Sequence, residues 1–297
     1  SDRDIVKHYK SIKDYSGSKS LNEKLINTVY NYKPDLLIFG HADLVKEETL
    51  SYLKDNYKNL KIAQWFLDPL MKDGPDYNKN KLRILDKINY TDANFITTSP
   101  DVLSFLPKKK LCLFMPNPTD ISFEVLNNYE NKHCSMDVFF ALSHGVHRGI
   151  LKKGKYDERA DFVNRLVEIT PNVKFDLYGI NNVQPIWADS FLKSISNAKM
   201  GVNLSRGNPI KYYSSDRITQ LIGNGLLTFI HEDTMYNNFF SNDEVVFYSN
   251  LSNLSEKIQR FARDEKSRKI IAKKGKQKYM KYFNSTTVAE YIINNTF

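Results

Sequence analysis

Cysteine and long apolar runs are both scarce in this chain of 297 residues. Its two cysteines, Cys112 and Cys134, each lie beside an apolar segment. Two thiols are too few for a disulfide framework, and they fit a reducing cytoplasm. No run approaches about 18 apolar residues, so no membrane-spanning helix is predicted. The polar first 17 residues do not have the apolar region of a secretory signal.

Several motifs that would specify other chemistries are also missing. The chain has no GxxxxGK[ST] phosphate loop, no GxSxG nucleophile turn and no GxGxxG dinucleotide turn. Cysteine and histidine spacings typical of zinc sites are absent as well. We therefore expect no metal and no cofactor.

The balance of charge is positive, with 43 Lys and Arg against 34 Asp and Glu, a net charge of +9. Such an excess can serve a polyanion, an anionic membrane surface or anionic substrates. It can equally reflect lysines on solvated faces, because the lysine clusters at 108–110, 152–155 and 273–276 are short and scattered. We expect no nucleic-acid partner, and peripheral contact with an anionic membrane stays open.

Strand-like and helix-like segments alternate along the chain, which predicts an α/β fold of parallel βαβ units with ligands beyond the carboxyl ends of the strands. The predicted strands are 35–39, 61–66, 93–98, 111–115, 136–142, 173–178, 201–205, 226–230 and 245–248. The predicted helices are 21–29, 46–57, 80–90, 101–106, 156–170, 187–198, a short one before Asn224, 233–240, 251–264, 266–283 and 286–295.

A break in this alternation indicates two domains. The segment Pro116-Asn-Pro-Thr-Asp120 is followed by a polar stretch without periodicity. We predict an N-terminal domain at 1–120, a linker at 121–135 and a second domain at 136–284. A last helix is predicted at 285–297, and no strand is predicted before Asp35.

The stretch from Met200 to Ile230 is the most informative part of the chain. Ser214, Ser215 and Asp216 offer N-cap oxygens for a short helix that Asn224-Gly225 closes. A helix N-terminus attracts anions, and Arg206, Lys211 and Arg217 surround this one in sequence. The alternative is an ordinary loop–helix connection with a solvated charged loop.

The same stretch resembles a known family. Asn203-Leu-Ser, then Ser215-Asp-Arg217-Ile-Thr-Gln220-Leu-Ile-Gly-Asn-Gly225 and an apolar strand, is similar to the donor-binding segment of GT-B glycosyltransferases, in the CgeB-like branch of group 1. The resemblance implies two Rossmann-like domains with parallel sheets facing a central cleft. It also implies that this segment binds the nucleotide diphosphate of an activated sugar. It further implies that the last helix, 285–297, crosses back to the first domain, and that the first domain, with no strand before Asp35, is reduced or trimmed. The family's Glu, which accepts hydrogen bonds from the ribose, is Gln220 here, and an amide accepts them without a full charge.

The resemblance extends to the loop that follows the strand at 136–142. It implies that this loop approaches the donor phosphates, with Arg148 as a bidentate contact, and that Tyr178 lies near the nucleotide base. The alternatives are an unstructured basic loop and a tyrosine of the core. The expected donor-binding residues are Gly145, His147, Arg148, Tyr178, Asn203, Arg206, Lys211, Ser215, Arg217 and Gln220.

Candidates for a general base lie in the first half of the chain. His41 and Asp43 follow one predicted strand, and Asp68 follows the next. An acceptor hydroxyl must lose its proton as a glycosidic bond forms, and an imidazole or carboxylate can take it. Asp68 also matches the family's Trp/Phe-x-Asp element. A retaining enzyme needs no such base, and each residue can instead be a strand-end cap.

These features predict a metal-independent glycosyltransferase of the cytoplasm. A UDP- or GDP-sugar is the expected donor, and a glycan or lipid-linked hydroxyl is the expected acceptor. The only Asp-x-Asp is Asp2-Arg-Asp4, which does not fit a metal-dependent GT-A enzyme. Two alternatives remain: a non-catalytic relative that binds nucleotide or glycan, and a basic polyanion-binding protein.

Overall fold

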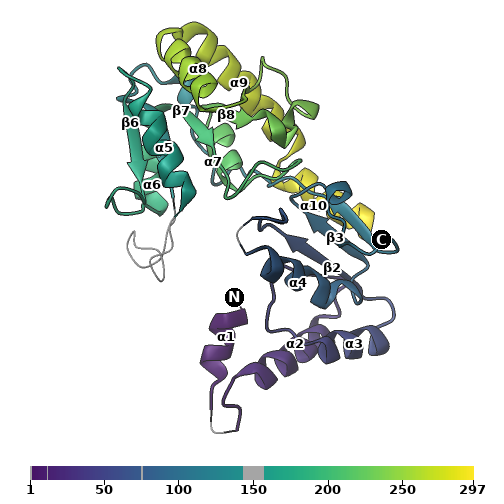
Figure 1. Cartoon of the computed structure of the whole chain (residues 1–297). Coiled ribbons are helices and arrows are strands. Elements are labelled where there is room, and N and C mark those ends of the chain that lie inside the picture. Colours follow the sequence, from purple (N-terminus) through teal and green to yellow (C-terminus); the bar gives the residue numbers. More distant parts are fainter. Residues whose placement is uncertain (1, 12, 75, 143–156) are drawn as a thin grey trace. The chain divides into compact units, whose positions relative to one another are not determined.

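The computed structural model describes residues 2–11, 13–74, 76–142 and 157–297 (Figure 1). The chain forms two compact units. Unit 1 comprises Ser1–Lys72, Asp76–Met115 and Ala289–Phe297, and unit 2 comprises Asp73–Pro75 and Pro116–Val288. Each unit contains one parallel β-sheet flanked by helices, so the predicted α/β class with two Rossmann-like domains is confirmed.

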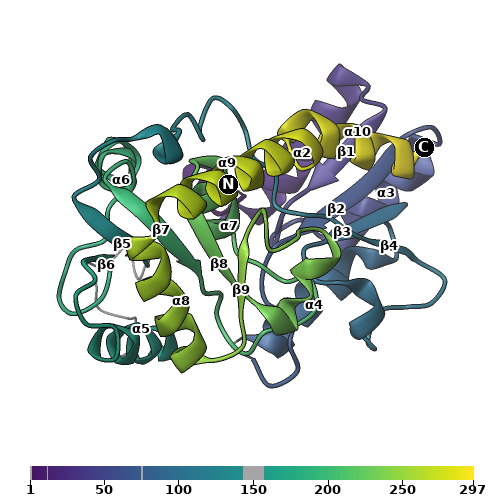
Figure 2. The ribbon, with the colours of Figure 1, turned by 90° about the horizontal axis from the view of Figure 1, so that it is seen from above.

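Unit 1 is built on a four-stranded sheet in the order β1-β2-β3-β4 (Figure 2). Leu50 and Leu53 of one helix pack with Phe39 and Ile62 of the sheet, and each such side chain contributes about 1.5–3 kcal/mol when it is fully buried. The strands are β1 (Leu36–Phe39), β2 (Lys61–Phe66), β3 (Ala93–Ile96) and β4 (Leu111–Phe114). The helices are α1 (Asp2–Tyr9), α2 (Ser18–Tyr32), α3 (Glu47–Asn56) and α4 (Tyr77–Ile88), with a 3₁₀ turn, η1 (Pro100–Val102).

Unit 2 is built on a five-stranded sheet in the order β6-β5-β7-β8-β9, which Figure 2 shows from one edge to the other. Its strands are β5 (Met136–Ala141), β6 (Phe175–Tyr178), β7 (Ala198–Asn203), β8 (Leu227–His231) and β9 (Val246–Tyr248). Its helices are α5 (Glu158–Glu168), α6 (Ala188–Ile195), α7 (Arg217–Gly223), α8 (Leu251–Arg263) and α9 (Glu265–Tyr282), and α10 (Ser285–Thr296) follows. A 3₁₀ turn, η2 (Asn128–Glu130), precedes β5.

Helices bury both faces of the second sheet. On one face, Leu254 and Ile258 of α8 pack with Phe229 of β8. On the other, Ile218 and Ile222 of α7 form a cluster with β8 and α9. This double cover explains why all but one residue in each of β7 and β8 is buried, instead of every second one.

The boundary between the units falls after Met115, five residues before the predicted end of the first domain. Residues 121–135, predicted as a linker, belong to unit 2. There the buried amide of Asn128 donates to the carbonyls of Ile195 (2.7 Å) and Ala198 (2.8 Å). The last helix is divided, since unit 1 includes α10 from Ala289 onward.

All nine predicted strands are present, but three details differ from the sequence-based predictions. The helix predicted at 101–106 is only the turn η1, and the one predicted at 233–240 is two 3₁₀ turns separated by Met235 at φ 53°. Helix α7 has no side-chain cap, because the Ser214 hydroxyl donates to Asn203 and the Ser215 hydroxyl accepts from Arg217. Within the described residues, no helix is long and apolar enough to cross a membrane.

Gly275 allows α9 to pack directly against the backbone of unit 2. A Cβ atom at this position would lie 2.1 Å from the carbonyl oxygen of Glu244. Alanine in a helix is favoured over glycine by about 1 kcal/mol, but displacing a packed helix costs about 1–3 kcal/mol. We therefore predict that Gly275→Ala lowers the free energy of unfolding in urea.

The matched control is Gly40→Ala, because a Cβ at Gly40 meets no atom within 4 Å. It should leave stability nearly unchanged. A stabilised Gly275→Ala variant would show that helix propensity outweighs the packing described here.

Candidate functional site

The second sheet has a topological switch point between β5 and β7. The chain passes from β5 to β6 on one side of the sheet and returns to β7 on the other side of β5. Connections that leave two adjacent strands in opposite directions open a crevice at their carboxyl ends. Those ends are Ala141 and Asn203, so the segment singled out in the sequence begins at the switch point.

Arg217, the first residue of α7, bridges the two strand ends. Its Nη1 donates to the carbonyl of Leu204 (2.6 Å) and its Nη2 to that of Ala141 (3.0 Å). The guanidinium also lies 5.0 Å from the centre of the Phe140 ring. Burial, with a smaller effect of the positive Arg159, lowers the pKa of Arg217 to about 10. Arg217 is still cationic at neutral pH and fixes a positive charge at the switch point.

A crevice of about 410 Å³ lies beside Arg217, and we call it the switch-point crevice. Leu142 closes one side of it, and Gln220 of α7 contributes an amide that makes no side-chain hydrogen bond with another described residue. Trp187 and Phe123 also line it and remain 55% and 72% exposed. The crevice therefore combines a cation, a polar amide and flat aromatic surfaces on which a base can stack.

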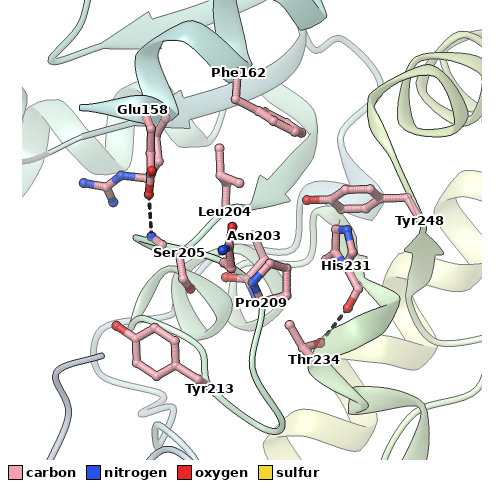
Figure 3. A pocket seen from close by; sticks show the side chains of 13 residues that line it. Glu158, Phe162, Asn203, Leu204, Ser205, Pro209, Tyr213, His231, Thr234 and Tyr248 are labelled. Atoms are coloured by element: carbon pink, nitrogen blue, oxygen red, sulfur yellow. Dashed lines mark hydrogen bonds between the residues drawn. The ribbon is translucent and has the colours of Figure 1, made fainter. Parts of the chain in front are cut away.

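A second cavity of about 280 Å³ lies beyond the ends of β7, β8 and β9, and Figure 3 shows it from close by. We call it the loop cavity, because the loop Asn203–Pro209 forms much of its wall. The Glu158 carboxylate accepts a hydrogen bond from the Gly207 amide (2.7 Å). The rings of His231 and Tyr248 meet edge to face at 5.1 Å.

The predicted donor residues fall into different places. Arg217 and Gln220 line the switch-point crevice, whereas Asn203 lines the loop cavity. The Asn203 side-chain oxygen accepts from the Ser214 hydroxyl (3.1 Å), and Ser215 Oγ accepts from Arg217 (3.2 Å). Asn203 and Ser215 therefore brace the loop that carries Arg217.

Tyr178 packs with the core cluster of α6. Its ring lies 6.1 Å from that of Phe139, and its hydroxyl accepts from Ser194 (3.1 Å). Arg206 and Lys211 are half-buried in the loop before α7 and do not line either cavity, and Lys211 Nζ lies 5.1 Å from the centre of the Tyr212 ring. Gly145, His147 and Arg148 lie outside the described residues.

In unit 1 two of the three predicted base candidates contact one arginine of α4, and the third contacts one of these two. Arg83 Nη2 lies 2.8 Å from Asp43 Oδ2, and Arg83 Nη1 lies 2.9 Å from Asp68 Oδ2. His41 Nε2 lies 3.3 Å from the same Asp68 oxygen. A second arginine, Arg3 of α1, lies 2.6 Å from Asp43. The ends of β1 and β2 thus carry one connected cluster of charged side chains.

Asp43 and Asp68 differ in their suitability as a proton acceptor. Burial raises the pKa of Asp43, but hydrogen bonds from Arg3 and Arg83 outweigh burial and hold it below its ordinary value. Asp43 is therefore a fixed carboxylate and a weak base. The side chains of His41 and Asp68 are 40% and 34% exposed, so they remain accessible to a substrate.

Sequence reasoning missed Arg83, Arg3, Trp187 and Phe123. A usable signal existed for Arg83, which is the only arginine of the lysine-rich helix α4. A guanidinium fits carboxylates in a way that an ammonium does not. Trp187 and Phe123 carried no such signal, because an aromatic residue before a helix or in a loop is usual.

Comparisons with known proteins agree with the fold described above. Residues 158–294 match a family model described as glycosyl transferase-like. No curated protein matches the sequence. TarM from S. aureus is 12% identical with a TM-score of 0.65, over 95% of this chain and 58% of TarM. HepE from Anabaena in complex with UDP is 10% identical with a TM-score of 0.62, over 93% of this chain and 81% of HepE.

Sucrose-phosphate synthase from Thermosynechococcus elongatus is also similar, at 13% identity and a TM-score of 0.61, over 94% of this chain and 77% of the synthase. At such identities the likeness concerns the fold, and the fold is GT-B, with two Rossmann-like domains. This chain spans only 58% of the length of TarM.

The lowered pKa of Asp43 predicts a defined acid dependence. A carboxyl whose pKa is lower in the folded state stabilises the fold at pH values above its pKa in the unfolded chain, near 3.8. This stabilisation is lost as the pH falls through the pKa of the folded state. At pH 7, Asp43→Asn should lower the free energy of unfolding by about 1–3 kcal/mol, because it leaves the half-buried Arg83 under-paired. Toward pH 2.5 the difference from wild type should shrink.

Trp65 fluorescence in a Trp187→Phe background reports unit 1 alone, since the chain has two tryptophans, one in each unit. Asp55→Asn is the matched control, because Asp55 forms an exposed pair with Lys58 that is worth at most about 0.5 kcal/mol. A deficit of Asp43→Asn that is equal at both pH values would refute the ion-pair account.

Proposed function

We propose that this protein is a glycosyltransferase that moves a sugar from a nucleoside-diphosphate sugar to an acceptor hydroxyl. The observation that carries the proposal is the switch-point crevice, which lies in unit 2 where ligands of α/β sheets bind. Most of its chemistry comes from Trp187, Arg217 and Gln220, which fall within the residues that match the glycosyl transferase-like family.

The donor would bind with its nucleoside in this crevice. The aromatic faces of Trp187 and Phe123 suit the base, and the Gln220 amide suits a ribose hydroxyl. HepE has been crystallised with UDP and with UDP-glucose, which supports a UDP-sugar as the donor to test first. We place the chain in the CgeB-like branch on the run from Ser215 to Gly225.

The leaving diphosphate develops negative charge as the sugar departs. Fixed cations stabilise such charge without reorganisation, and Arg217 supplies one at the switch point. Its Nη1 and Nη2 already donate to the carbonyls of Leu204 and Ala141, so Arg217 acts mainly through its electric field. We propose that Arg148 makes the direct contacts with the phosphates. We also propose that the reaction needs no metal.

The acceptor hydroxyl would be deprotonated by His41. The Asp68 carboxylate, 3.3 Å from Nε2, favours a proton on that nitrogen and leaves Nδ1 as the proton acceptor. Arg83 holds Asp68 in place from the other side. This arrangement suits direct displacement with inversion at the sugar. A glycan or lipid-linked acceptor, with contact at an anionic membrane surface, completes the proposal.

Nucleotide binding is predicted to depend on Gln220. In a thermal-shift screen against UDP, GDP, CDP, TDP and ADP, with and without Mg²⁺ or Mn²⁺, one nucleotide should raise Tm without metal. Gln220→Ala should reduce the shift. Gln220→Glu should enlarge it, because a charged acceptor adds about 1 kcal/mol, or roughly fivefold in Kd.

The matched control is Gln277→Ala, which removes an exposed amide from α9. It should leave the shift intact. If no nucleotide changes Tm, the nucleotide-sugar proposal fails, and a glycan-binding relative without turnover becomes the better account.

Turnover is predicted to depend on His41. UDP release from UDP-glucose in the presence of simple glycosides should fall by about 10²–10⁴-fold in His41→Ala, as for loss of a general base. The nucleotide-induced Tm shift should persist, because His41 belongs to unit 1. His8→Ala, an exposed histidine of α1, is the control. Wild-type turnover by His41→Ala, or a product with retained anomeric configuration, would remove His41 from the mechanism.

A further inference from the structure

Another polar cavity lies at the other end of the strands of the second sheet, away from the switch-point crevice. A cavity of about 290 Å³ is lined by the segment 131–135 and by Lys199, Glu265 and Arg268. Met136, the first residue of β5, pairs with Ala198, the first of β7, so the cavity lies at the amino ends of these strands. The switch-point crevice lies at their carboxyl ends. The two sites are therefore separate, and this one is independent of the proposed transferase activity.

Arg268 of α9 is the most unusual member of this cavity. The residue is only 4% exposed, and its Nε–H is buried without a hydrogen-bond partner. Within the part of the chain that the structure describes, its guanidinium makes no hydrogen bond or ion pair. Burial lowers the pKa of Arg268, but a guanidinium keeps its proton in proteins. A buried cation without a bonded acceptor is costly unless something else satisfies it.

The neighbouring carboxylates are already engaged by other cations. Glu265 pairs with Lys269 at 2.5 Å, and Asp137 pairs with Lys199 at 2.7 Å. Asp137 also accepts from the backbone amide of Lys174. These acids therefore pair with the lysines beside them, and they act on Arg268 only through their electric field, without a hydrogen bond or an ion pair.

Other side chains that line the cavity contribute positive charge and uncharged hydrogen-bond donors. Lys132 and His133 are exposed at its rim, and both belong to the segment before β5. Cys134 is half-buried beside them, and burial raises the pKa of its thiol, against the opposing effect of Arg268. The thiol is therefore neutral at pH 7 and adds no negative charge.

We propose that this cavity is an oxyanion site that binds a phosphate group, with the guanidinium of Arg268 as its principal donor. A guanidinium offers paired N–H groups that match two oxygens of a phosphate, and Lys132 adds a cation at the rim. The volume of the cavity admits inorganic phosphate or the phosphate of a small phosphorylated metabolite. The donor nucleotide is assigned to the switch-point crevice, at the carboxyl ends of the strands.

Cys134 provides a reporter for the test. Cys112 is the only other cysteine and lies in unit 1, so Cys112→Ser leaves Cys134 as the sole thiol. Its alkylation by iodoacetamide at pH 8 can be followed by intact mass, with inorganic phosphate titrated against chloride at constant ionic strength. Phosphate should slow alkylation saturably. In Arg268→Gln the apparent Kd for phosphate should rise at least about tenfold, which corresponds to about 1.4 kcal/mol.

Two further variants separate a binding role from a structural one. Arg263→Gln removes an exposed arginine of α8 and should keep the phosphate effect. Arg268→Lys keeps the charge without the fork and should bind with intermediate affinity. Without phosphate, Arg268→Gln should unfold at the same temperature as wild type or higher, because it removes an unpaired buried charge.

The results that would overturn the proposal are equally specific. Alkylation that phosphate and chloride slow equally would show no oxyanion site. Unchanged phosphate protection in Arg268→Gln would remove Arg268 from it. A large fall in Tm for both Arg268→Gln and Arg268→Lys in the absence of phosphate would assign Arg268 to the support of the fold. Protection by a sugar phosphate at lower concentration than by inorganic phosphate would support the site and identify the metabolite as the source of the group.

Discussion

The candidate site of unit 2 depends on the hydrogen bonds between Arg217 and two strand ends. The carbonyls of Ala141 and Leu204 lie where the sheet stops, and the guanidinium of Arg217 needs acceptors because it is withdrawn from water. The carbonyls supply the acceptors that the guanidinium needs, and the guanidinium supplies the donors that the carbonyls need. Ala141 also lines the switch-point crevice and Leu204 lines the loop cavity, so one side chain holds the walls of both spaces.

Three arginines of this protein show how acceptors determine what a buried cation does. Arg217 has neutral carbonyls and becomes a fixed charge within the fold. Arg83 has two carboxylates and organises the strand ends of unit 1 into a cluster with an accessible histidine. Arg268 has no hydrogen-bonded acceptor among the described residues and is assigned a ligand instead. Arg83 and Arg217 are half-buried and Arg268 is buried, and the acceptors around each arginine differ.

The sequence allowed the fold to be predicted further than the site. Alternating apolar and amphipathic segments determine parallel βαβ units, so all nine strands could be predicted, and with them the strand ends at which the candidate site lies. The convergence of Asp43 and Asp68 on Arg83, and of His41 on Asp68, could not, because it depends on contacts across up to 40 positions of sequence between elements whose spacing leaves no pattern. The cap predicted for α7 failed for a similar reason, since Asn203 and Arg217 take up the serine hydroxyls that would have formed it.

The division of α10 also bears on the order in which the chain is made. Unit 1 includes Ala289–Phe297, where Ile292 is buried and Tyr291 packs edge to face against Phe95. A ribosome completes the sheet of unit 1 long before it adds these residues, whereas nearly all of unit 2 is one continuous segment. Domains usually mature in the order of their synthesis, but the core of unit 1 becomes complete only after the residues of unit 2 have been made. The first sheet to leave the ribosome is the last to acquire its full core.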